Sequence, residues 1–429
     1  MTQDTTRGLR VAARWERPIV APEGGKVALM LRITAAKDEP ATKPRRSPLD
    51  VAFVLDRSGS MAGDKLRLVK EAVDVATELL HDDDRAALVI FDNAIETLQP
   101  LQPATPRTKT ALRLALNGVD AGGSTDLCGG WLAGCQELAK AQAKDATSSR
   151  PRRALLLTDG QANVGITDPA ELQRHATELR KRGISTTTVG VGDDYDQALL
   201  SGMAEAGGGT YEHIAHPSEL RAFFSREIGE LLSMVALTPR LHLTLPHRVH
   251  GRLLNPFPAR RAGKTISVDL SDFAAGDEVV LLFDCWPVAT SRDASTDVQP
   301  SLRVSWADPA ADRRERIELP LPPLTLGTKE EAEHAPVDAE VREQAALERA
   351  AHERREGIRL DREGRFAEAR AHFHHAAVTL SAAPQSADVQ DAYQMSAHLA
   401  QTDPTIGLAE SVRKQRFADD HRRSRGRRT

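Results

Sequence analysis

Apolar residues between positions 51 and 232 follow two alternating patterns. Short runs rich in aliphatic and β-branched residues, typical of buried strands, alternate with amphipathic stretches of helical length. Strands that alternate with helices in this way predict an α/β domain whose mostly parallel sheet is covered on both faces. The predicted strands are VAFVL (51–55), AALVIF (86–91), RALLLT (153–158), STTTVGV (185–191) and TYEHI (210–214).

Helix signals separate these strands. Residues 61–80 place apolar side chains three and four positions apart, which predicts a helix with one stripe facing the sheet. A second helix is expected to start with Asp168 as its cap and Pro169 in its first turn, and to end near Gly183.

Outside residues 51–232, apolar residues recur at every second position, which is typical of antiparallel strands with one buried face. The predicted strands lie at 25–34, 240–245, 264–270, 278–284 and 301–306. Because the N-terminal strands alone could not form a stable sheet, we expect residues 1–46 to pair with 236–326. The sequence therefore predicts a discontinuous antiparallel β-sandwich, with the α/β domain (47–234) inserted between its two parts.

The C-terminal part differs in composition. A Pro-rich linker is followed by a segment dense in Ala, Glu and Arg (335–400), which predicts a helical module in the form of a hairpin broken near Gly364. Residues 401–429 carry a basic, apolar-poor tail that we expect to be disordered.

Composition narrows the functional classes. With 57 Lys and Arg against 61 Asp and Glu in 429 residues, the net charge is −4, so no global field favours nucleic acid, and the basic tail is the one feature that could contact it. Three cysteines and no apolar signal-peptide core point to a reducing, cytoplasmic location. No apolar run approaches the roughly 20 residues of a membrane span, so we expect no membrane insertion.

Oxygen-bearing side chains occur in three loops that are expected at the same edge of the sheet. Asp56, Ser58 and Ser60 alternate through a tight loop after the first strand, GGSTD brings Thr125, and LLLTDG brings Asp159. Ligands of open α/β sheets bind beyond the carboxyl ends of the strands, so these five donors are expected to meet. Hard divalent ions such as Mg²⁺ prefer ligands of this kind.

The segments DRSGS (56–60), GGST (122–125) and TDG (158–160) resemble the von Willebrand factor A (VWA) domain and its metal-ion-dependent adhesion site (MIDAS). The resemblance implies a doubly wound, Rossmann-like fold. It also implies metal binding through the hydroxyls of Ser58 and Ser60, with Thr125 joining in the ligand-bound state and Asp56 and Asp159 acting directly or through water. The cation would be Mg²⁺, or Mn²⁺ or Ca²⁺.

A shell richer in hydroxyls than in carboxylates leaves the cation electrophilic, so an Asp or Glu of a partner protein can complete its coordination. The flanking strands are similar to a bacterial branch related to inter-alpha-trypsin inhibitor heavy chains and calcium-activated chloride channel regulators. This resemblance implies non-enzymatic protein–protein interaction, or alternatively an accessory role beside an AAA+ ATPase in a chelatase-like or chaperone-like complex.

Other kinds of site fit these motifs less well. DRSGS could be a capped turn, but that leaves the other two motifs unexplained. A phosphatase of the haloacid dehalogenase type needs a second Asp where Ser58 stands, and no G-x-S-x-G surrounds either serine. GKT (263–265) lacks the first glycine of a phosphate loop, and the histidines of HFHH (372–375) are expected on a solvated helix surface.

Two further expectations concern the site's surroundings. Access is expected to be shaped by Arg57, Met61, Asp92 and Gly123. The last helix of the α/β domain, Pro217 to Met234, is the candidate for a shift on ligand binding, and its apolar face is also expected to be core. That face comprises Leu220, Phe223, Phe224, Ile228 and Leu231.

Overall fold

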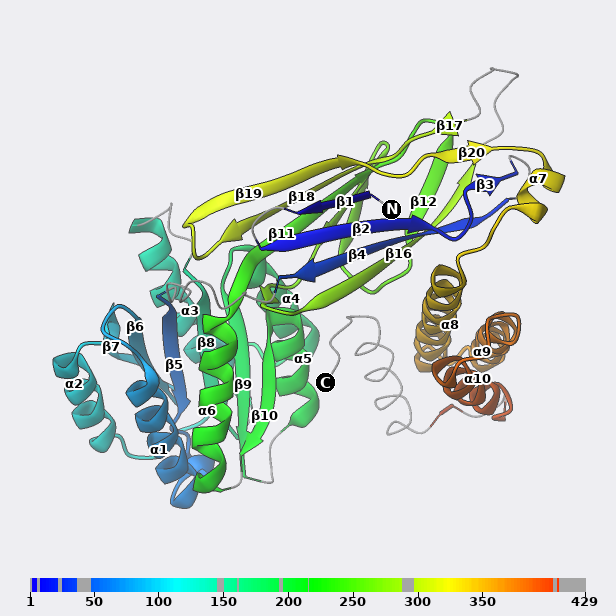
Figure 1. Cartoon of the computed structure of the whole chain (residues 1–429). Coiled ribbons are helices and arrows are strands. Elements are labelled where there is room, and N and C mark those ends of the chain that lie inside the picture. Colours follow the sequence, from blue (N-terminus) through cyan, green and yellow to red (C-terminus); the bar gives the residue numbers. More distant parts are fainter. Residues whose placement is uncertain are drawn as a thin grey trace.

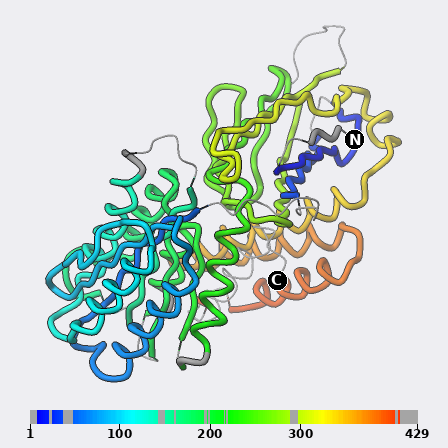
Figure 2. The backbone as a smooth tube through the Cα atoms, turned by 60° about the vertical axis from the view of Figure 1, so that its left-hand side comes forward, coloured from blue at the N-terminus to red at the C-terminus, as the bar shows by residue number. Residues whose placement is uncertain are grey.

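The computed structural model describes residues 2–5, 8–21, 25–36, 48–144, 150–159, 162–192, 196–214, 216–287, 297–403 and 407–408. Figure 1 shows an α/β domain, an elongated pair of β-sheets and a group of C-terminal helices, and Figure 2 shows the same arrangement turned by 60°.

The α/β domain is built on one six-stranded sheet. All five predicted strands are present, and each is parallel to its neighbour among them. The sheet order is β10 (Gly208–Ile214), β9 (Ser185–Val191), β8 (Arg152–Thr158), β5 (Asp50–Asp56), β6 (Arg85–Phe91) and β7 (Ile95–Pro103). The edge strand β7 is antiparallel and mostly exposed, so it has no continuous apolar run that would have predicted it.

Helices cover both faces of this sheet. One face carries α1 (Asp64–Leu79), α2 (Pro106–Asn117) and α6 (Pro217–Leu232), and the other carries α3 (Leu127–Lys144), α4 (Pro169–Lys181) and α5 (Gln197–Gly207). The predicted signals of α4 are confirmed, because the Asp168 side chain accepts a hydrogen bond from the backbone N–H of Glu171 and Pro169 is the first helical residue. The predicted Rossmann-like α/β fold is therefore observed.

A buried polar network holds α6 on the sheet. Its predicted apolar face is core, and Glu227 on the same helix lies 3.4 Å from the guanidinium of Arg153, with both side chains 2% exposed. The Glu227 carboxylate also accepts hydrogen bonds from the hydroxyls of Thr187 and Thr210 at 2.6 and 2.7 Å. The helix is thus fixed by a charge pair as well as by apolar packing.

Two antiparallel sheets enclose the second core. The first sheet orders β1 (Thr2–Thr5), β2 (Leu9–Trp15), β4 (Val27–Ala35), β16 (Glu278–Pro287) and β12 (Val249–Leu253). The second orders β13 (Ala259–Ala262), β14 (Thr265–Asp269), β11 (Met234–Thr244), β18 (Ser301–Asp308) and β19 (Arg313–Pro320), and β15 (Phe273–Ala274) pairs with β11. Because β4 pairs with β16, strands from before and after the α/β domain lie in one sheet.

The polypeptide passes from the α/β domain into the sandwich without a linker, since α6 ends at Leu232 and β11 begins at Met234. Three short strands, β17 (Asp297–Val298), β20 (Leu324–Leu326) and β3 (Ile19–Val20), form a small sheet next to the main pair.

The C-terminal module contains more helices than the predicted hairpin. After α7 (Lys329–His334), the helices α8 (Ala339–Arg362) and α9 (Phe366–Ser381) form the hairpin, and α10 (Ala387–Ala400) packs against α9. The hairpin prediction was incomplete because α10 buries only four residues, of which two are Ala and Ser, so its apolar face is weak in the sequence. Beyond the hairpin, the predicted disordered tail lies largely outside the described residues.

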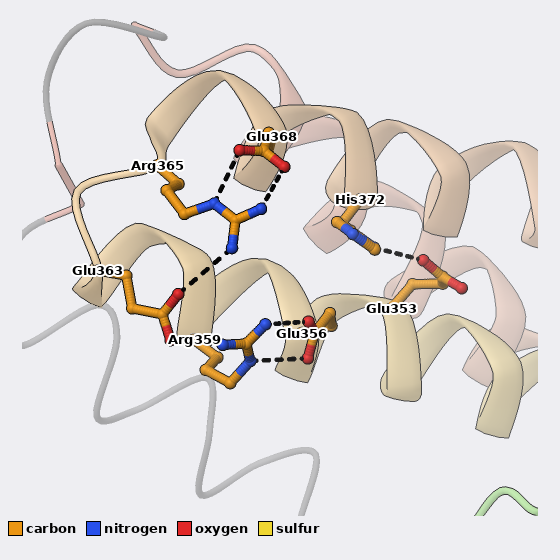
Figure 3. Close-up of polar contacts among 7 residues, drawn as sticks. All are labelled: Glu353, Glu356, Arg359, Glu363, Arg365, Glu368 and His372. Atoms are coloured by element: carbon orange, nitrogen blue, oxygen red, sulfur yellow. Dashed lines mark hydrogen bonds and ion pairs between the residues drawn. The ribbon is translucent and has the colours of Figure 1, made fainter.

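Figure 3 shows charged side chains of α8 and α9 that contact one another. His372 Nδ1 lies 2.7 Å from a carboxylate oxygen of Glu353, and His375 lies 3.4 Å from the same oxygen, so these histidines are paired with a carboxylate rather than simply solvated. Arg365 bridges Glu363 and Glu368 nearby, and Arg359 contacts Glu356. Exposed pairs of this kind contribute little to stability.

A buried carboxylate anchors α8 to the sandwich. Asp284 on β16 is 0% exposed and lies 2.7 Å from the Arg349 guanidinium of α8 and 2.6 Å from the Lys26 ammonium. Val341 and Ala345 of α8 pack onto the same sheet. No helix within the described ranges combines the length and apolar character needed to cross a membrane.

Candidate metal centre

Asp56 is the last residue of the central strand β5, and its carboxylate is 0% exposed. Oδ1 accepts a hydrogen bond from the backbone N–H of Ser58 at 2.8 Å, and Oδ2 accepts one from the hydroxyl of Thr158 at 2.5 Å. Burial raises the pKa of Asp56, these hydrogen bonds oppose the rise, and the neighbouring charge of Asp159 adds to it. Two buried carboxylates this close to each other favour the binding of a cation.

The two serines of the first loop lie side by side. Ser58 is buried and precedes a single 3₁₀ turn, Gly59–Met61, in which Ser60 is exposed. Their hydroxyl oxygens are 3.1 Å apart. Neighbouring ligands of an octahedral Mg²⁺ with bonds of roughly 2.1 Å lie about 3 Å apart, so this pair suits the geometry of the ion.

Backbone hydrogen bonds join the first loop to the loop that carries Thr125. The N–H of Gly59 donates to the carbonyl of Gly123 at 3.0 Å, and the N–H of Gly122 donates to the carbonyl of Arg57 at 2.8 Å. Thr125 itself is 1% exposed. The structure therefore brings the second loop, which connects α2 to α3, directly against the serine loop.

The loop after β8, the third loop of the site, forms hydrogen bonds with Thr125. The side-chain oxygen of Asn163 accepts a hydrogen bond from the N–H of Thr125 at 2.7 Å. In return, the carbonyl of Thr125 accepts hydrogen bonds from the N–H groups of Asn163 and Val164 at 3.2 and 3.1 Å. Asn163 was not predicted as a site residue, because its loop carries no periodic pattern that would indicate its partner.

Asp159 follows β8 and is 0% exposed. Its Oδ2 lies 3.2 Å from the ammonium of Lys65, whereas its Oδ1 has no hydrogen-bond partner within the part of the chain that the structure describes. The Lys65 side chain reaches the carboxylate across Gly192, where a Cβ would come within 2.7 Å of Lys65 Cε. Lys65 lies in the first turn of α1, and the sequence motif gave no reason to assign it to the site.

These residues fit a hard divalent cation. Two carboxylates and three hydroxyls supply oxygen donors only, and the buried, unpaired Oδ1 of Asp159 is the kind of atom that a cation would satisfy. Among the described residues, no cluster of three or more His, Cys, Asp or Glu side chains forms a different kind of metal site.

The predicted rim needs one correction. Met61 is 0% exposed and belongs to the core, so it does not shape access to the site. Arg57 lies 3.3 Å from the carboxylate of Asp92, which holds its side chain near the loop. Gly123 has φ +73°, and a Cβ there would meet Asp92 and Asn93, so this close approach of loops requires glycine.

The chain is similar to curated proteins of several organisms. It is 25% identical to the uncharacterized protein YfbK of Escherichia coli over 71% of this chain and 55% of that protein. It is 28% identical to the uncharacterized protein sll0103 of Synechocystis over 70% of each. Human inter-alpha-trypsin inhibitor heavy chain H3 is 28% identical over 53% of this chain but only 26% of its own length. The chain therefore spans about half of YfbK and a quarter of the heavy chain.

Solved structures resemble the whole chain in fold. The von Willebrand factor type A protein from Catenulispora acidiphila superimposes with a TM-score of 0.65 at 19% identity, covering 100% of this chain and 99% of that one. The ArnB paralog VWA2 from Sulfolobus acidocaldarius has a TM-score of 0.58 at 17% identity and covers 97% and 98%. The family model of the von Willebrand factor type A domain matches residues 50–226. The chain therefore contains a von Willebrand factor type A domain, and the segment that carries it includes the whole candidate metal centre.

Proposed function

We propose that this protein is a non-enzymatic interaction module that binds an acidic residue of a partner protein through a divalent cation at the MIDAS. Ser58, Ser60 and Thr125 would hold the cation through their hydroxyls, and Asp56 and Asp159 would do so directly or through water. The cation proposed first is Mg²⁺, with Mn²⁺ and Ca²⁺ as alternatives. When bound, it supplies a Lewis-acid coordination position for a carboxylate from the partner.

The observation that carries this proposal is that hydrogen bonds join three loops, one of which begins at a buried carboxylate with an unpaired oxygen. The serine loop is hydrogen-bonded to the Thr125 loop, which Asn163 fixes in turn, and Asp159 Oδ1 remains without a hydrogen bond within the described chain. If the site bound no cation, this buried oxygen would stay without any partner, which costs about 1–3 kcal/mol of stability.

The domain class supports the same proposal. VWA domains commonly mediate protein–protein interaction, and proteins that carry them are generally not enzymes. Within the described site the hydroxyls of Ser58 and Ser60 contact each other, and Ser58 contacts the carboxylate of Asp56 rather than a histidine, so these serines do not form a serine–histidine pair. We propose a cytoplasmic location, supported by three cysteines that are all buried and free.

The first test measures Mg²⁺ and Mn²⁺ binding by isothermal titration calorimetry. The wild type should bind one ion, and Asp56→Ala should bind none, because the variant removes the buried carboxylate at the base of the site. Asp64→Ala is the matched control, since the side chain of Asp64 is 92% exposed in the first turn of α1. Equal binding by the wild type and a folded Asp56→Ala protein would contradict the metal site.

The second test identifies the partner. The wild type with Mg²⁺, the wild type with EDTA and Asp56→Ala with Mg²⁺ are used to capture proteins from the native lysate. A partner retained only in the first sample supports a metal-bridged contact, and identical partners in all three would place the interaction elsewhere on the molecule. An ATPase among the metal-dependent partners would favour the accessory role beside an AAA+ machine.

A further inference from the structure

Two exposed apolar side chains, one at the start of β7 and one on a loop, lie near the candidate metal centre. Ile95 is 43% exposed and Val164 is 37% exposed. The other large, exposed apolar side chains of the described chain lie elsewhere, at Leu114, Val337, Val378 and Tyr393. Single exposed apolar residues are common on protein surfaces, so the argument rests on where these two are held.

Ile95 follows the tight turn after β6. The side chain of Asp92 accepts a hydrogen bond from the N–H of Ala94 at 2.6 Å, and the carbonyl of Asp92 accepts one from the N–H of Asp126 at 2.9 Å. A Cβ on Gly129 would come within 2.6 Å of Ile95 Cδ1. The Ile95 side chain therefore lies over the start of α3, close to the residue that follows Thr125.

Val164 approaches the same place from the third loop. Its N–H donates to the carbonyl of Thr125 at 3.1 Å, and a Cβ on the next residue, Gly165, would come within 2.7 Å of Asp126 Oδ1. Asp126 also lies within 2.5 Å of a Cβ placed on Gly129. Ile95 at the start of β7 and Val164 on the third loop thus flank the Thr125–Asp126 step.

Two positively charged side chains also lie beside the candidate metal centre. Arg57 and Lys65 each have side chains that are 24% exposed, and each is held by a carboxylate of the site or its rim, Asp92 and Asp159 respectively. The site is therefore bordered by two cations that are paired with carboxylates and by two apolar side chains, and hydrogen bonds fix the backbone next to Ile95 and Val164. Such a surface is complementary to an acidic group with an apolar neighbour.

We infer that the partner presents its Asp or Glu next to an aliphatic or aromatic residue, which packs against Ile95 and Val164 while the carboxylate enters the metal site. This inference rests on the proposed function and names the chemistry of the partner segment. Fixed loops make the contact preorganised, so the apolar neighbour adds affinity without the cost of ordering the protein.

The test uses two biotinylated peptides that differ only beside a central glutamate, Gly-Ser-Leu-Glu-Leu-Ser-Gly and Gly-Ser-Ser-Glu-Ser-Ser-Gly. Binding of the full chain to the immobilised peptides is measured by biolayer interferometry with Mg²⁺ and with EDTA. We expect the leucine peptide to bind roughly three- to tenfold more tightly in Mg²⁺, as burial of one or two methyl groups would give. A peptide with Gln in place of Glu should not bind.

Ile95→Ser and Val164→Ser should each reduce the preference for leucine and leave Mg²⁺ affinity unchanged. Leu114→Ser is the matched control, because it removes an apolar side chain that is 67% exposed on α2, and it should leave the preference intact. Metal-dependent binding without a preference for leucine, or a preference unaffected by the two rim variants, overturns this inference alone. The absence of metal-dependent binding to either peptide overturns the proposed function and the inference with it.

Discussion

The Lys65 ammonium lies 3.2 Å from Oδ2 of Asp159, the carboxylate whose other oxygen has no hydrogen-bond partner within the described residues. The chain therefore places a cation of its own next to the candidate metal centre. This ammonium balances part of the buried negative charge of Asp56 and Asp159, and it repels any divalent ion that binds between them.

Replacing Lys65 by Met should strengthen Mg²⁺ binding. A unit charge about 4–6 Å from a divalent ion contributes on the order of 1–2 kcal/mol of repulsion even at the dielectric of bulk water, about 80, so the Kd should fall about tenfold or more. Isothermal titration calorimetry at low salt measures the change. Lys329→Met removes a lysine whose side chain is 86% exposed and should leave the Kd unchanged. Weaker Mg²⁺ binding by Lys65→Met would show that the ammonium supports the site instead of competing with the ion.

Asn163→Ala should weaken metal binding although Asn163 is not a proposed ligand. Its side chain fixes the backbone of Thr125, and loss of such a positioning contact typically lowers metal affinity by about 10- to 100-fold. The Kd for Mn²⁺ can be followed by calorimetry at constant pH. Asn117→Ala changes an exposed asparagine at the end of α2 and serves as the control. An unchanged Kd in Asn163→Ala would mean that packing alone positions Thr125.

Glu227→Ala should strongly destabilise the VWA domain. The change leaves Arg153 charged and buried without its partner, which typically costs about 3–5 kcal/mol. Guanidinium unfolding, followed by circular dichroism, gives the loss in free energy. Replacing both residues by Met should cost less than the single change, because no unpaired buried charge remains.

Arg226, the residue before Glu227, provides the control for the Glu227→Ala prediction. Arg226 forms an exposed ion pair with Glu212, and its side chain is 62% exposed. Arg226→Ala should cost no more than about 1 kcal/mol. Equal losses for Arg226→Ala and Glu227→Ala would contradict the role assigned to the buried pair.

The anchor between the sandwich and the helical module should weaken in acid. Burial alone would raise the pKa of Asp284, but the charges and hydrogen bonds of Arg349 and Lys26 outweigh it, and the pKa lies below the usual range. A carboxylate with a lowered folded-state pKa contributes stability that is present above the unfolded value of about 3.9 and is lost as pH falls through the folded value.

Urea unfolding at pH 7 and pH 3 tests this expectation. Asp284→Asn should lower the unfolding midpoint at pH 7, where it leaves Arg349 and Lys26 without their anion, and the gap from the wild type should narrow at pH 3. Asp391→Asn, an exposed change on α10, should behave as the wild type at both pH values. A gap of the same size at both pH values would mean that the ionisation of Asp284 contributes nothing to the anchor.

The local pattern of the chain predicted the central sheet and the donors around it. Each run of five to seven apolar or β-branched residues between helix signals became a parallel strand, and Asp56 and Asp159 were predicted at strand ends because parallel strands point their carboxyl ends to one edge. Asp168 and Pro169 marked the start of α4 because a helix terminus needs a side-chain acceptor and tolerates proline.

Other features depended on contacts between residues far apart in sequence. Met61 follows the motif directly, yet the packing of α1 on the sheet buries it. Lys65 reaches Asp159 across 94 positions, and Thr158 reaches Asp56 across 102.

The sequence by itself determined the five parallel strands of the central sheet, the start of α4, and the carboxylates that end β5 and follow β8, because hydrophobic periodicity and capping act over a few residues. Only the tertiary structure decided that the loops interlock around Thr125, that Lys65 shares the carboxylate of Asp159, and that Ile95 and Val164 border the site. Those outcomes depend on how the loops pack after the sheet has formed, and no local pattern encodes the distance between side chains on different strands.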